Sequence, residues 1–224
     1  MKKVLLIHGY NGTPDGIWIP WLKKILEEKG FRVFAPQLPG GSLPSLEEET
    51  KTIKRIISKF GKKDSIVTHS KGAVPTLHAI LENNKKLKSL LLFAPVLTFE
   101  YFNPKFIEKS ERTSGDSQRS ADNWKNMTTY WTKTVDVSQA SHLVPVTAIF
   151  SNDDPIADPV ASALVPKDWH IEKWDGCKHF WRTEEPQLLE LILEKINSSV
   201  LLNHFAPDIS VGGNFFLRLN QISF

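Results

Sequence analysis

Short, continuously apolar runs alternate along the chain with longer segments whose apolar residues recur every three or four positions. The run Val-Leu-Leu-Ile at residues 4–7 is typical of a parallel strand that is covered on both faces. Residues 18–29 have the second pattern, with Gly30 at the expected helix end. This alternation predicts an α/β fold, in which right-handed crossovers build a mostly parallel sheet flanked by helices on both faces. The predicted strands are residues 4–7, 31–35, 65–67, 87–93, 145–150 and 169–174, and the predicted helices are 18–29, 45–60, 73–83, 184–197 and a short crossover helix near 159–164.

The regular alternation breaks between residues 95 and 141. Polar, turn-forming residues at 114–117 lie there between clusters of aromatic residues. A long insertion in a compact α/β domain is usually functional, so one interpretation is a small helical cap over the site. The other interpretation is a surface excursion whose aromatic residues pack on its own helices, and the sequence favours neither. The aromatic residues are Phe99, Tyr101, Phe102, Phe106, Trp124, Tyr130 and Trp131.

The predicted domain spans residues 1–197, because the helix at 184–197 would complete a compact unit of sheet and helices. Residues 198–224 form a C-terminal extension of unknown role. Its apolar residues could extend the sheet, pack on a neighbouring molecule or belong to an appendage. A chain of 224 residues, of which 41% are apolar, can bury one substantial core, so a second domain is not required.

Composition and charge exclude several classes of protein. The excess of 28 basic over 25 acidic residues gives a net charge of only +3, and the basic residues are scattered, which argues against a nucleic-acid partner. The single cysteine, Cys177, excludes an internal disulfide and fits a reducing compartment. The apolar run at 4–7 is too short for a signal peptide or a membrane span. We therefore expect a cytoplasmic protein without a membrane partner, and the sequence leaves its oligomeric state undefined.

The most informative motif is Thr-His-Ser-Lys-Gly at residues 68–72, which joins a predicted strand to a predicted helix. A serine on such a turn is lifted out of a parallel sheet and faces the free N–H groups of the following helix. Ser70 is therefore the candidate nucleophile. The alternative is an ordinary tight turn, since Ser-x-Gly is common. The same spacing recurs at Ser210, but there no clear helix follows and no Asp and His lie downstream.

Candidate partners for Ser70 lie after later strands. Asp153 and Asp154 follow one predicted strand, and His179 follows the next. A serine nucleophile needs a base, the base needs a carboxylate, and the carboxyl ends of parallel strands meet at one edge of a sheet. The chain order Ser, Asp, His is that of α/β-hydrolases. Asp154 is preferred to Asp153 as the acid, because it directly precedes Pro155 as in a usual Asp-Pro turn.

Two N–H donors are needed to stabilise an oxyanion. The amide of Lys71, directly after the nucleophile, is the first candidate. The amide of Tyr10, in the glycine-rich loop after the first strand, is the second, and an ordinary turn is the alternative for that loop. His69 is a weaker candidate than His179 for the base, because adjacent side chains on a turn point apart. His8 is expected to shape the oxyanion loop.

No cofactor is implied, and we predict no metal site. Asp175, Cys177 and His179 are zinc-ligating residue types, but they lack the paired His or Cys spacing of a zinc site. The first strand is followed by His-Gly-Tyr-Asn-Gly-Thr and not by Gly-x-Gly-x-x-Gly, which argues against a dinucleotide-binding fold.

These motifs resemble, in their order, those of the compact α/β-hydrolases of the YdeN and retinoblastoma-binding-protein serine hydrolase family. The resemblance spans about residues 2–197. It implies a compact α/β-hydrolase fold with Ser70 as nucleophile, Asp154 as acid and His179 as base, in a family whose members look like esterases or amidases of poorly defined substrate. The segments that carry it are residues 4–12 (VLLIHGYNG), 18–22 (WIPWL), 69–72 (HSKG), 152–155 (NDDP) and 176–180 (GCKHF).

Two residues of the nucleophile motif depart from the pattern of that family. Thr68 replaces the usual glycine two residues before Ser70, although threonine still favours the strand side of the turn. Lys71 replaces the usual apolar residue after the nucleophile. It either places a cation near the site, which would favour an anionic substrate, or pairs with a nearby carboxylate.

The sequence thus predicts a carboxylesterase-like serine hydrolase that cleaves a small ester, in preference to an amide, through an acyl-enzyme on Ser70. Its partner would be a small-molecule ester or acyl substrate. The alternative is a non-catalytic hydrolase-fold protein that binds a peptide or protein partner through the aromatic insertion. The residues expected to line the substrate pocket are His8, Trp18, Trp21, Phe180 and Trp181.

Overall fold

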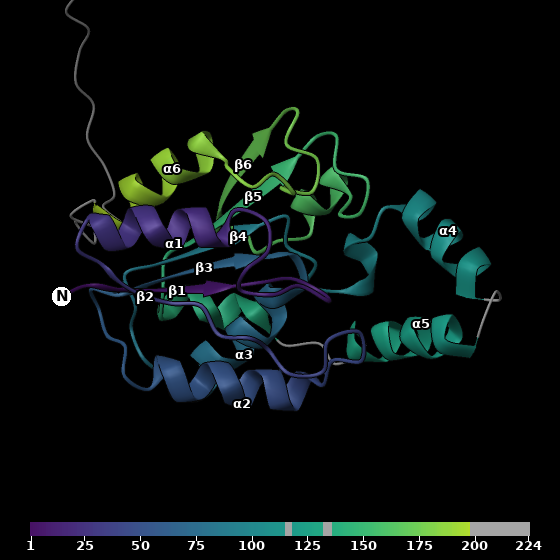
Figure 1. The fold of residues 1–224 in the computed structure, drawn as a ribbon, viewed down its shortest axis with the longest axis horizontal. Coiled ribbons are helices and arrows are strands. Elements are labelled where there is room, and N and C mark those ends of the chain that lie inside the picture. Colours follow the sequence, from purple (N-terminus) through teal and green to yellow (C-terminus); the bar gives the residue numbers. More distant parts are fainter. Residues whose placement is uncertain (115–117, 132–135, 198–224) are drawn as a thin grey trace, which may run out of the picture.

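A computed structural model of the chain describes residues 1–114, 118–131 and 136–197. Its centre is a six-stranded sheet in the order β2-β1-β3-β4-β5-β6, in which every neighbouring pair is parallel (Figure 1). The strand order reverses at β1, and open α/β sheets bind ligands at the carboxyl ends of the strands beside such a reversal. The strands are β1 (Lys3–Ile7), β2 (Arg32–Phe34), β3 (Ser65–His69), β4 (Ser89–Phe93), β5 (Val146–Ser151) and β6 (His170–Trp174).

Helices cover both faces of the sheet. Helices α1 and α6 lie on one face, and α2 and α3 lie on the other (Figure 1). The predicted α/β architecture is therefore confirmed, and the predicted strands and these helices recur with ends shifted by a few residues. The helices of the two layers are α1 (Ile19–Glu28), α2 (Leu46–Ile57), α3 (Ala73–Asn83) and α6 (Pro186–Asn197).

The ends of the helices follow the local sequence. Ser45 is the N-cap of α2, where its Oγ accepts a hydrogen bond from the Glu48 amide at 3.4 Å. Three acidic residues, Glu47 to Glu49, stand in the first turn, at the positive end of the helix dipole. Helix α3 ends at Asn84, whose left-handed backbone stops the helix.

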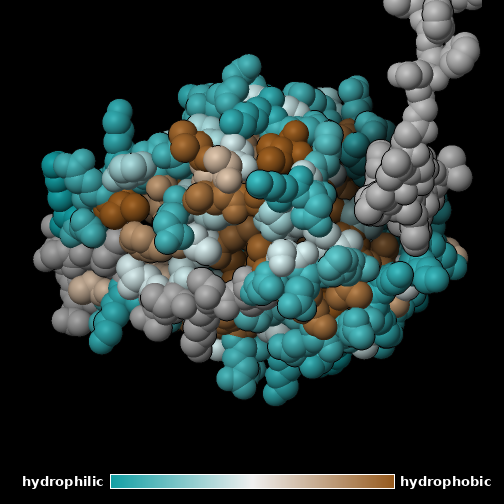
Figure 2. Space-filling view, turned by 180° about the vertical axis from the view of Figure 1, so that it is seen from behind, coloured by the Kyte–Doolittle hydropathy of each residue, from teal (hydrophilic) through white to brown (hydrophobic). Residues whose placement is uncertain are grey.

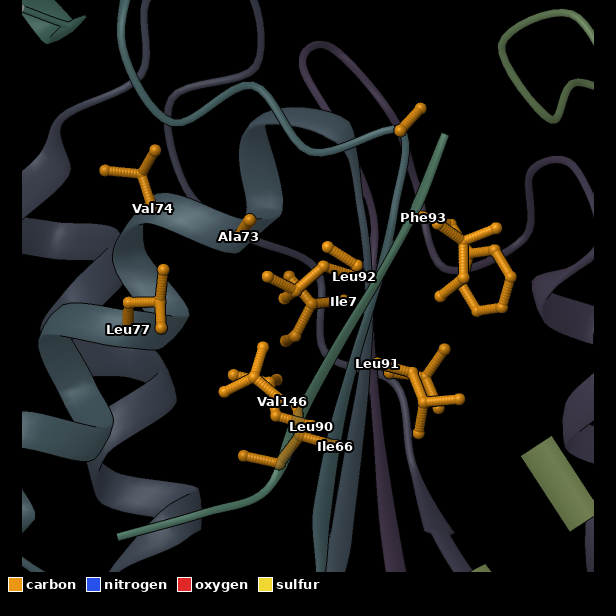
Figure 3. Close-up of a cluster of buried hydrophobic side chains, with 14 of the residues drawn as sticks. Ile7, Ile66, Ala73, Val74, Leu77, Leu90, Leu91, Leu92, Phe93 and Val146 are labelled. Atoms are coloured by element: carbon orange, nitrogen blue, oxygen red, sulfur yellow. The ribbon is translucent and has the colours of Figure 1, made fainter. Parts of the chain in front are cut away.

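Side chains of the central strands alternate between the two helical layers (Figure 3). Ile66 and Leu92 lie on the side of the sheet that faces Leu77 of α3, whereas Leu91 and Phe93 point to the other side. All five side chains are fully buried. Because both faces of the parallel sheet are covered, strands of this kind have unbroken apolar sequences.

The connection between β5 and β6 differs from the prediction. In place of the crossover helix expected near residues 159–164, the chain forms a single 3-10 turn, η4 (Pro159–Ala163). Asp158 caps this turn by accepting a hydrogen bond from the Val160 amide at 2.9 Å. Pro166, which a helix interior does not tolerate, follows soon afterwards and limits the length of any helix that begins at Pro159.

The described part of the insertion at residues 95–141 projects beyond the carboxyl ends of the strands, where α4 and α5 lie side by side (Figure 1). Its aromatic rings pack on one another, as Phe102 and Trp131 do with ring centres 4.9 Å apart. Phe102 also forms a β-bridge with Ala157, in the loop after β5. The predicted extension at 198–224 lies outside the described residues. The elements of the insertion are η2 (Phe99–Tyr101), α4 (Pro104–Ser114), α5 (Gln118–Trp131) and η3 (Val137–His142).

The surface is mostly hydrophilic, although hydrophobic side chains are visible on the face opposite to that of Figure 1 (Figure 2). Among the described residues, the large hydrophobic side chains with high exposure include Val160, at 71%, and Trp181, at 49%. None of the described helices has both the length and the hydrophobicity that a bilayer span requires. The cytoplasmic location stays a prediction.

Gly72, at the start of α3, has no room for a side chain. A Cβ atom there would lie 2.5 Å from the carbonyl oxygen of His8 and 2.7 Å from Cγ2 of Ile7. We expect Gly72→Ala to lower the free energy of unfolding by about 1–3 kcal/mol, because the backbones of α3 and β1 must move apart. Urea denaturation measures this change. Gly61→Ala is the control, since no atom lies within 4 Å of its Cβ position, and equal losses in the two variants would contradict the close contact.

Candidate active site

Ser70 directly follows β3 and is the first residue of η1 (Ser70–Gly72). This 3-10 turn continues directly into α3, so the chain turns sharply at Ser70. Its φ of 52° is a left-handed conformation, which is costly for a residue with a side chain. Such a turn presents the hydroxyl at the carboxyl edge of the sheet. The loop after β1 lies against it, since a Cβ atom on Gly9 would be 3.0 Å from Cβ of Ser70.

The structure brings Ser70, His179 and Asp154 into one hydrogen-bonded chain. Nε2 of His179 is 2.9 Å from Oγ of Ser70, and its Nδ1 is 2.8 Å from Oδ2 of Asp154. All three side chains are buried. The other oxygen of Asp154 accepts hydrogen bonds from the amides of Ile156 (2.8 Å) and Ala157 (3.0 Å), which fix the orientation of the carboxylate.

Asp153, the alternative acid, makes different contacts. Its Oδ1 accepts hydrogen bonds from Oγ of Ser151 (2.6 Å) and from the amide of Lys178 (3.0 Å). These hydrogen bonds, that of Ser151 foremost, lower the pKa of Asp153 to about 2. Oγ of Ser151 in turn accepts a hydrogen bond from the Cys177 amide. Asp153 therefore anchors the loop that carries His179 and does not touch the imidazole.

His8 joins two loops at the edge of the sheet. Its Nε2 accepts a hydrogen bond from the Leu38 amide at 3.0 Å, so Nδ1 carries the proton and donates to the Gly9 carbonyl at 2.9 Å. Burial lowers the pKa of His8 and favours this neutral form. The histidine thus fixes the glycine-rich loop after β1 to the segment after β2.

His69 holds the loop that carries His179, the candidate base. Its Nε2–H donates to the carbonyl oxygen of His179 at 2.8 Å, and the two rings are 4.9 Å apart. Burial, followed by the proximity of His179, lowers the pKa of His69 to about 3. The ring is therefore neutral at ordinary pH, and its one ring proton is committed to a backbone acceptor.

Of the two predicted oxyanion donors, Lys71 directly follows Ser70, and Tyr10 belongs to the loop that lies against Ser70. The amide of Lys71 belongs to the first turn of η1, where the helix supplies no acceptor. Tyr10 lines the same cavity as Ser70, and its hydroxyl donates to the Ser42 carbonyl at 2.7 Å. This hydrogen bond holds the Tyr10 loop in place beside Ser70.

The side chain of Lys71 is not directed to the cavity. Its ammonium group forms a buried ion pair with Glu49 of α2, and the side chains of both residues are 2% exposed. Of the two predicted environments for this lysine, the structure contains the carboxylate pair. The cation therefore offers no contact to an anionic substrate.

A cavity of about 210 Å³ opens beside Ser70 and His179. Apolar side chains dominate its wall, and no Lys, Arg, Asp or Glu is among the described residues that line it. The insertion supplies one side of it, from α4, α5 and the segment between η2 and α4. Besides Ser70, His179, Tyr10 and the glycines, the main lining residues are His8, Ile17, His69, Phe102, Phe106, Met127, Trp131, Ile156 and Trp181.

Three of the predicted pocket residues lie elsewhere. Trp18 and Phe180 are fully buried in the core, where both rings pack against Phe93, at 6.0 and 5.4 Å. Trp21 is partly buried on α1 and packs against the same core. The left-handed backbone of Phe180 turns its side chain away from that of His179. Of the predicted set, only His8 and Trp181 line the cavity.

Sequence patterns did not identify the other lining residues or Glu49. Aromatic clustering in the insertion pointed to Phe102, Phe106 and Trp131, but not to their place in the wall. Glu49 had a clearer signal, because it occupies a core-facing position on α2 between Leu46 and Ile53. A carboxylate within an apolar stripe implies a buried partner.

The alternative zinc site does not assemble in the described part of the chain. Both ring nitrogens of His179 are engaged by Ser70 and Asp154, and Sγ of Cys177 lies near the Asp175 carbonyl, at 3.6 Å. No group of three or more potential metal ligands occurs among the described residues.

Comparison with known proteins places the chain in a family. A family model described as serine hydrolase matches residues 4–178. The YdeN protein of Bacillus subtilis (strain 168) is 29% identical over 165 residues, which cover 73% of this chain and 81% of YdeN. The crystal structure of the B. subtilis ydeN gene product gives a TM-score of 0.70 at 19% identity, covering 88% of this chain and all of that one.

A second solved structure, an extracellular α/β-hydrolase from a Paenibacillus species, gives a TM-score of 0.65 at 16% identity and covers 87% of this chain and 99% of that one. The likeness to both structures lies in the fold, with its parallel sheet between helical layers. The family model spans well over half of the sequence. The chain has an α/β-hydrolase fold and belongs to the serine hydrolase family.

Proposed function

We propose that the protein cleaves a small carboxylic ester through an acyl-enzyme on Ser70. The observation that carries this proposal is the hydrogen-bonded chain from Oγ of Ser70 through His179 to Asp154, at the wall of an apolar cavity. Nδ1–H of His179 donates to Asp154, so Nε2 is free to accept the proton of the serine hydroxyl. This arrangement supplies the base that a serine nucleophile needs.

The reaction proceeds in two steps that use the same groups. Oγ of Ser70 attacks the ester carbonyl as His179 takes the hydroxyl proton, and Asp154 stabilises the imidazolium. The amides of Tyr10 and Lys71 stabilise the oxyanion. His179 then protonates the leaving alcohol, which leaves the acyl group on Ser70. Water, deprotonated by His179, releases the carboxylic acid and restores the serine.

The cavity supports a short, uncharged acyl group. Its volume of about 210 Å³ and its wall of aromatic and aliphatic side chains, Phe102, Trp131 and Ile156 among them, offer apolar contacts. Burying a charged acyl group there would require a partner that the described lining residues do not supply. The ion pair of Lys71 also argues against selection for an anion.

The two departures from the family motif are compatible with catalysis. Thr68 is buried in β3, paired with Ile7 and Leu92 in regular parallel register, so the strand before the elbow is undistorted. Lys71 changes the side chain after the nucleophile but keeps the amide that the oxyanion needs. These observations favour an enzyme over a binding protein on the same scaffold.

Ser70→Ala tests the nucleophile directly. We expect the variant to lose labelling by a fluorophosphonate probe and to hydrolyse p-nitrophenyl butyrate at least about 10³-fold more slowly, because no hydroxyl is left to acylate. Ser210→Ala, which alters the other Ser-x-Gly motif, is the matched control and should label and turn over like the wild type. Undiminished labelling of Ser70→Ala refutes the assignment.

The adjacent aspartates offer a second matched pair of variants. Asp154→Asn should lower kcat by about 10⁴-fold, because the amide favours the wrong tautomer of His179. Asp153→Asn should lower kcat by no more than about 10-fold, because Asp153 contacts the loop and not the imidazole. Steady-state kinetics on one ester measures both. The reverse ranking would identify Asp153 as the acid.

His69 should make stability depend on pH. Its pKa falls from 6.5 in the unfolded chain to about 3 in the folded protein, so between these values only the unfolded state binds its proton. The contribution of His69 to the free energy of unfolding therefore has its full value above pH 6.5. It falls by about 1.4 kcal/mol for each pH unit below that, within the window between the two pKa values. Urea denaturation at pH 7, 6 and 5 measures this change in the free energy of unfolding.

The comparison protein is His69→Gln, which keeps an N–H for the His179 carbonyl but does not titrate. We expect its unfolding free energy to fall less steeply than that of the wild type between pH 6 and 5. Parallel curves for the two proteins would show that His69 titrates normally in the folded state.

A further inference from the structure

The ion pair behind the nucleophile is among the most buried polar features of the described structure. The side chain of Lys71, directly after Ser70, reaches Glu49 of α2, with its ammonium group in contact with both carboxylate oxygens. Two charges removed from water are costly unless their remaining hydrogen-bonding positions are also filled. The pair therefore needs a third partner.

Tyr130 of α5 is that partner. Its hydroxyl donates to Oε2 of Glu49 at 2.7 Å, and the ammonium group of Lys71 lies 4.8 Å from the centre of its ring. Burial, and then the charge of Glu49, raise the pKa of the Tyr130 hydroxyl, so it remains a hydrogen-bond donor. The nucleophile turn, α2 and the insertion thus meet at one buried charge pair.

The same segment of α5 forms part of the cavity wall. Trp131, the next residue, lines the cavity and donates its Nε1–H to the Val96 carbonyl at 2.9 Å, beyond the end of β4. Met127, one turn earlier on the side of α5 that bears Trp131, also lines the cavity. The hydrogen bond of Tyr130 to the ion pair therefore holds the segment of α5 that carries these two side chains.

We propose that the Lys71–Glu49 pair, completed by Tyr130, is a positioning device that anchors α5 to the nucleophile turn and so sets the acyl-chain length the cavity accepts. The inference rests on the proposed esterase function for its catalytic meaning. The three side chains do not touch the reacting atoms: they act through the wall formed by Met127 and Trp131. An apolar residue after the nucleophile could not provide this link, because it would leave Glu49 unpaired.

Tyr130→Phe is the decisive variant, because it removes one hydroxyl and keeps the ring over Lys71. Losing a hydrogen bond to a charged, buried group should raise amide hydrogen exchange in α5 by about 10-fold. Tyr101→Phe is the matched control, since Tyr101 is a buried tyrosine of the same insertion that does not line the cavity. It should leave exchange in α5 unchanged.

Kinetics on p-nitrophenyl acetate, butyrate and octanoate measure the consequence for substrate choice. In Tyr130→Phe we expect KM for butyrate to rise about 5-fold with kcat within about 2-fold, because the wall moves while Ser70, His179 and Asp154 stay in place. The ratio of kcat/KM for octanoate to that for butyrate should rise. Tyr101→Phe should keep the wild-type ratio.

The double variant Lys71→Met, Glu49→Leu separates positioning from charge balance. Replacing a buried pair by apolar residues of similar size often restores stability. We expect only a small loss of stability together with an altered chain-length ratio, because the hydroxyl of Tyr130 has lost its acceptor. A double variant with both the stability and the chain-length ratio of the wild type would overturn the proposal, because the acyl-chain length that the cavity accepts would then not depend on the pair.

Unchanged exchange in α5, or an unchanged chain-length ratio in Tyr130→Phe, would also overturn it. Failure of the proposed function has a different signature, namely that the wild-type protein is not labelled at Ser70 by the fluorophosphonate. The exchange comparison between Tyr130→Phe and Tyr101→Phe still decides whether α5 is anchored in that case, because it does not depend on turnover.

Discussion

The left-handed backbone of Ser70 is the constraint on which the rest of the site depends. A strand and a helix that meet without a loop must turn sharply, and the turn is stable only if the neighbouring chain leaves space for it. Gly72 provides this space against β1, and Gly9 provides it against Ser70 itself. The strain is thus held by the packing of α3 on the sheet.

The other polar groups each hold one part of the site in place. His8 and His69, both neutral, donate their ring protons to backbone carbonyls. Asp153 fixes the loop of His179 by accepting a hydrogen bond from the Lys178 amide in that loop. His179 alone among them contacts the serine hydroxyl. Three histidines in one small volume are tolerated because burial keeps two of them uncharged, so the imidazolium formed during catalysis would meet little repulsion.

The sequence predicts the sheet and the positions of Ser70, Asp154 and His179 because strand ends in a parallel sheet share one edge, a rule that needs no knowledge of side-chain packing. It fails for Trp18 and Phe180, since adjacency along the chain does not tell which side of a loop a ring occupies. Phe180 follows His179 directly, yet a left-handed φ of 54° sends it into the core. A helical cap over the site is one of the two interpretations that the sequence offers for the insertion. The sequence does not show which residues of α4 and α5 form the wall, because that depends on how the insertion packs beyond the carboxyl ends of the strands.

Lys71 shows how one substitution beside a nucleophile constrains residues far away in the chain. A lysine there is tolerable only with a buried carboxylate, and Glu49 is tolerable in the apolar stripe of α2 only with a buried cation. The hydroxyl of Tyr130 then fills the carboxylate's remaining position, which ties the insertion to the core. Removing Lys71 or Glu49 alone leaves an unpaired buried charge, whereas removing the Tyr130 hydroxyl takes one hydrogen bond from a carboxylate that Lys71 still contacts. A serine hydrolase of this fold with an apolar residue after its nucleophile therefore has no reason to keep an acid at the position of Glu49, and its insertion must be held by other contacts.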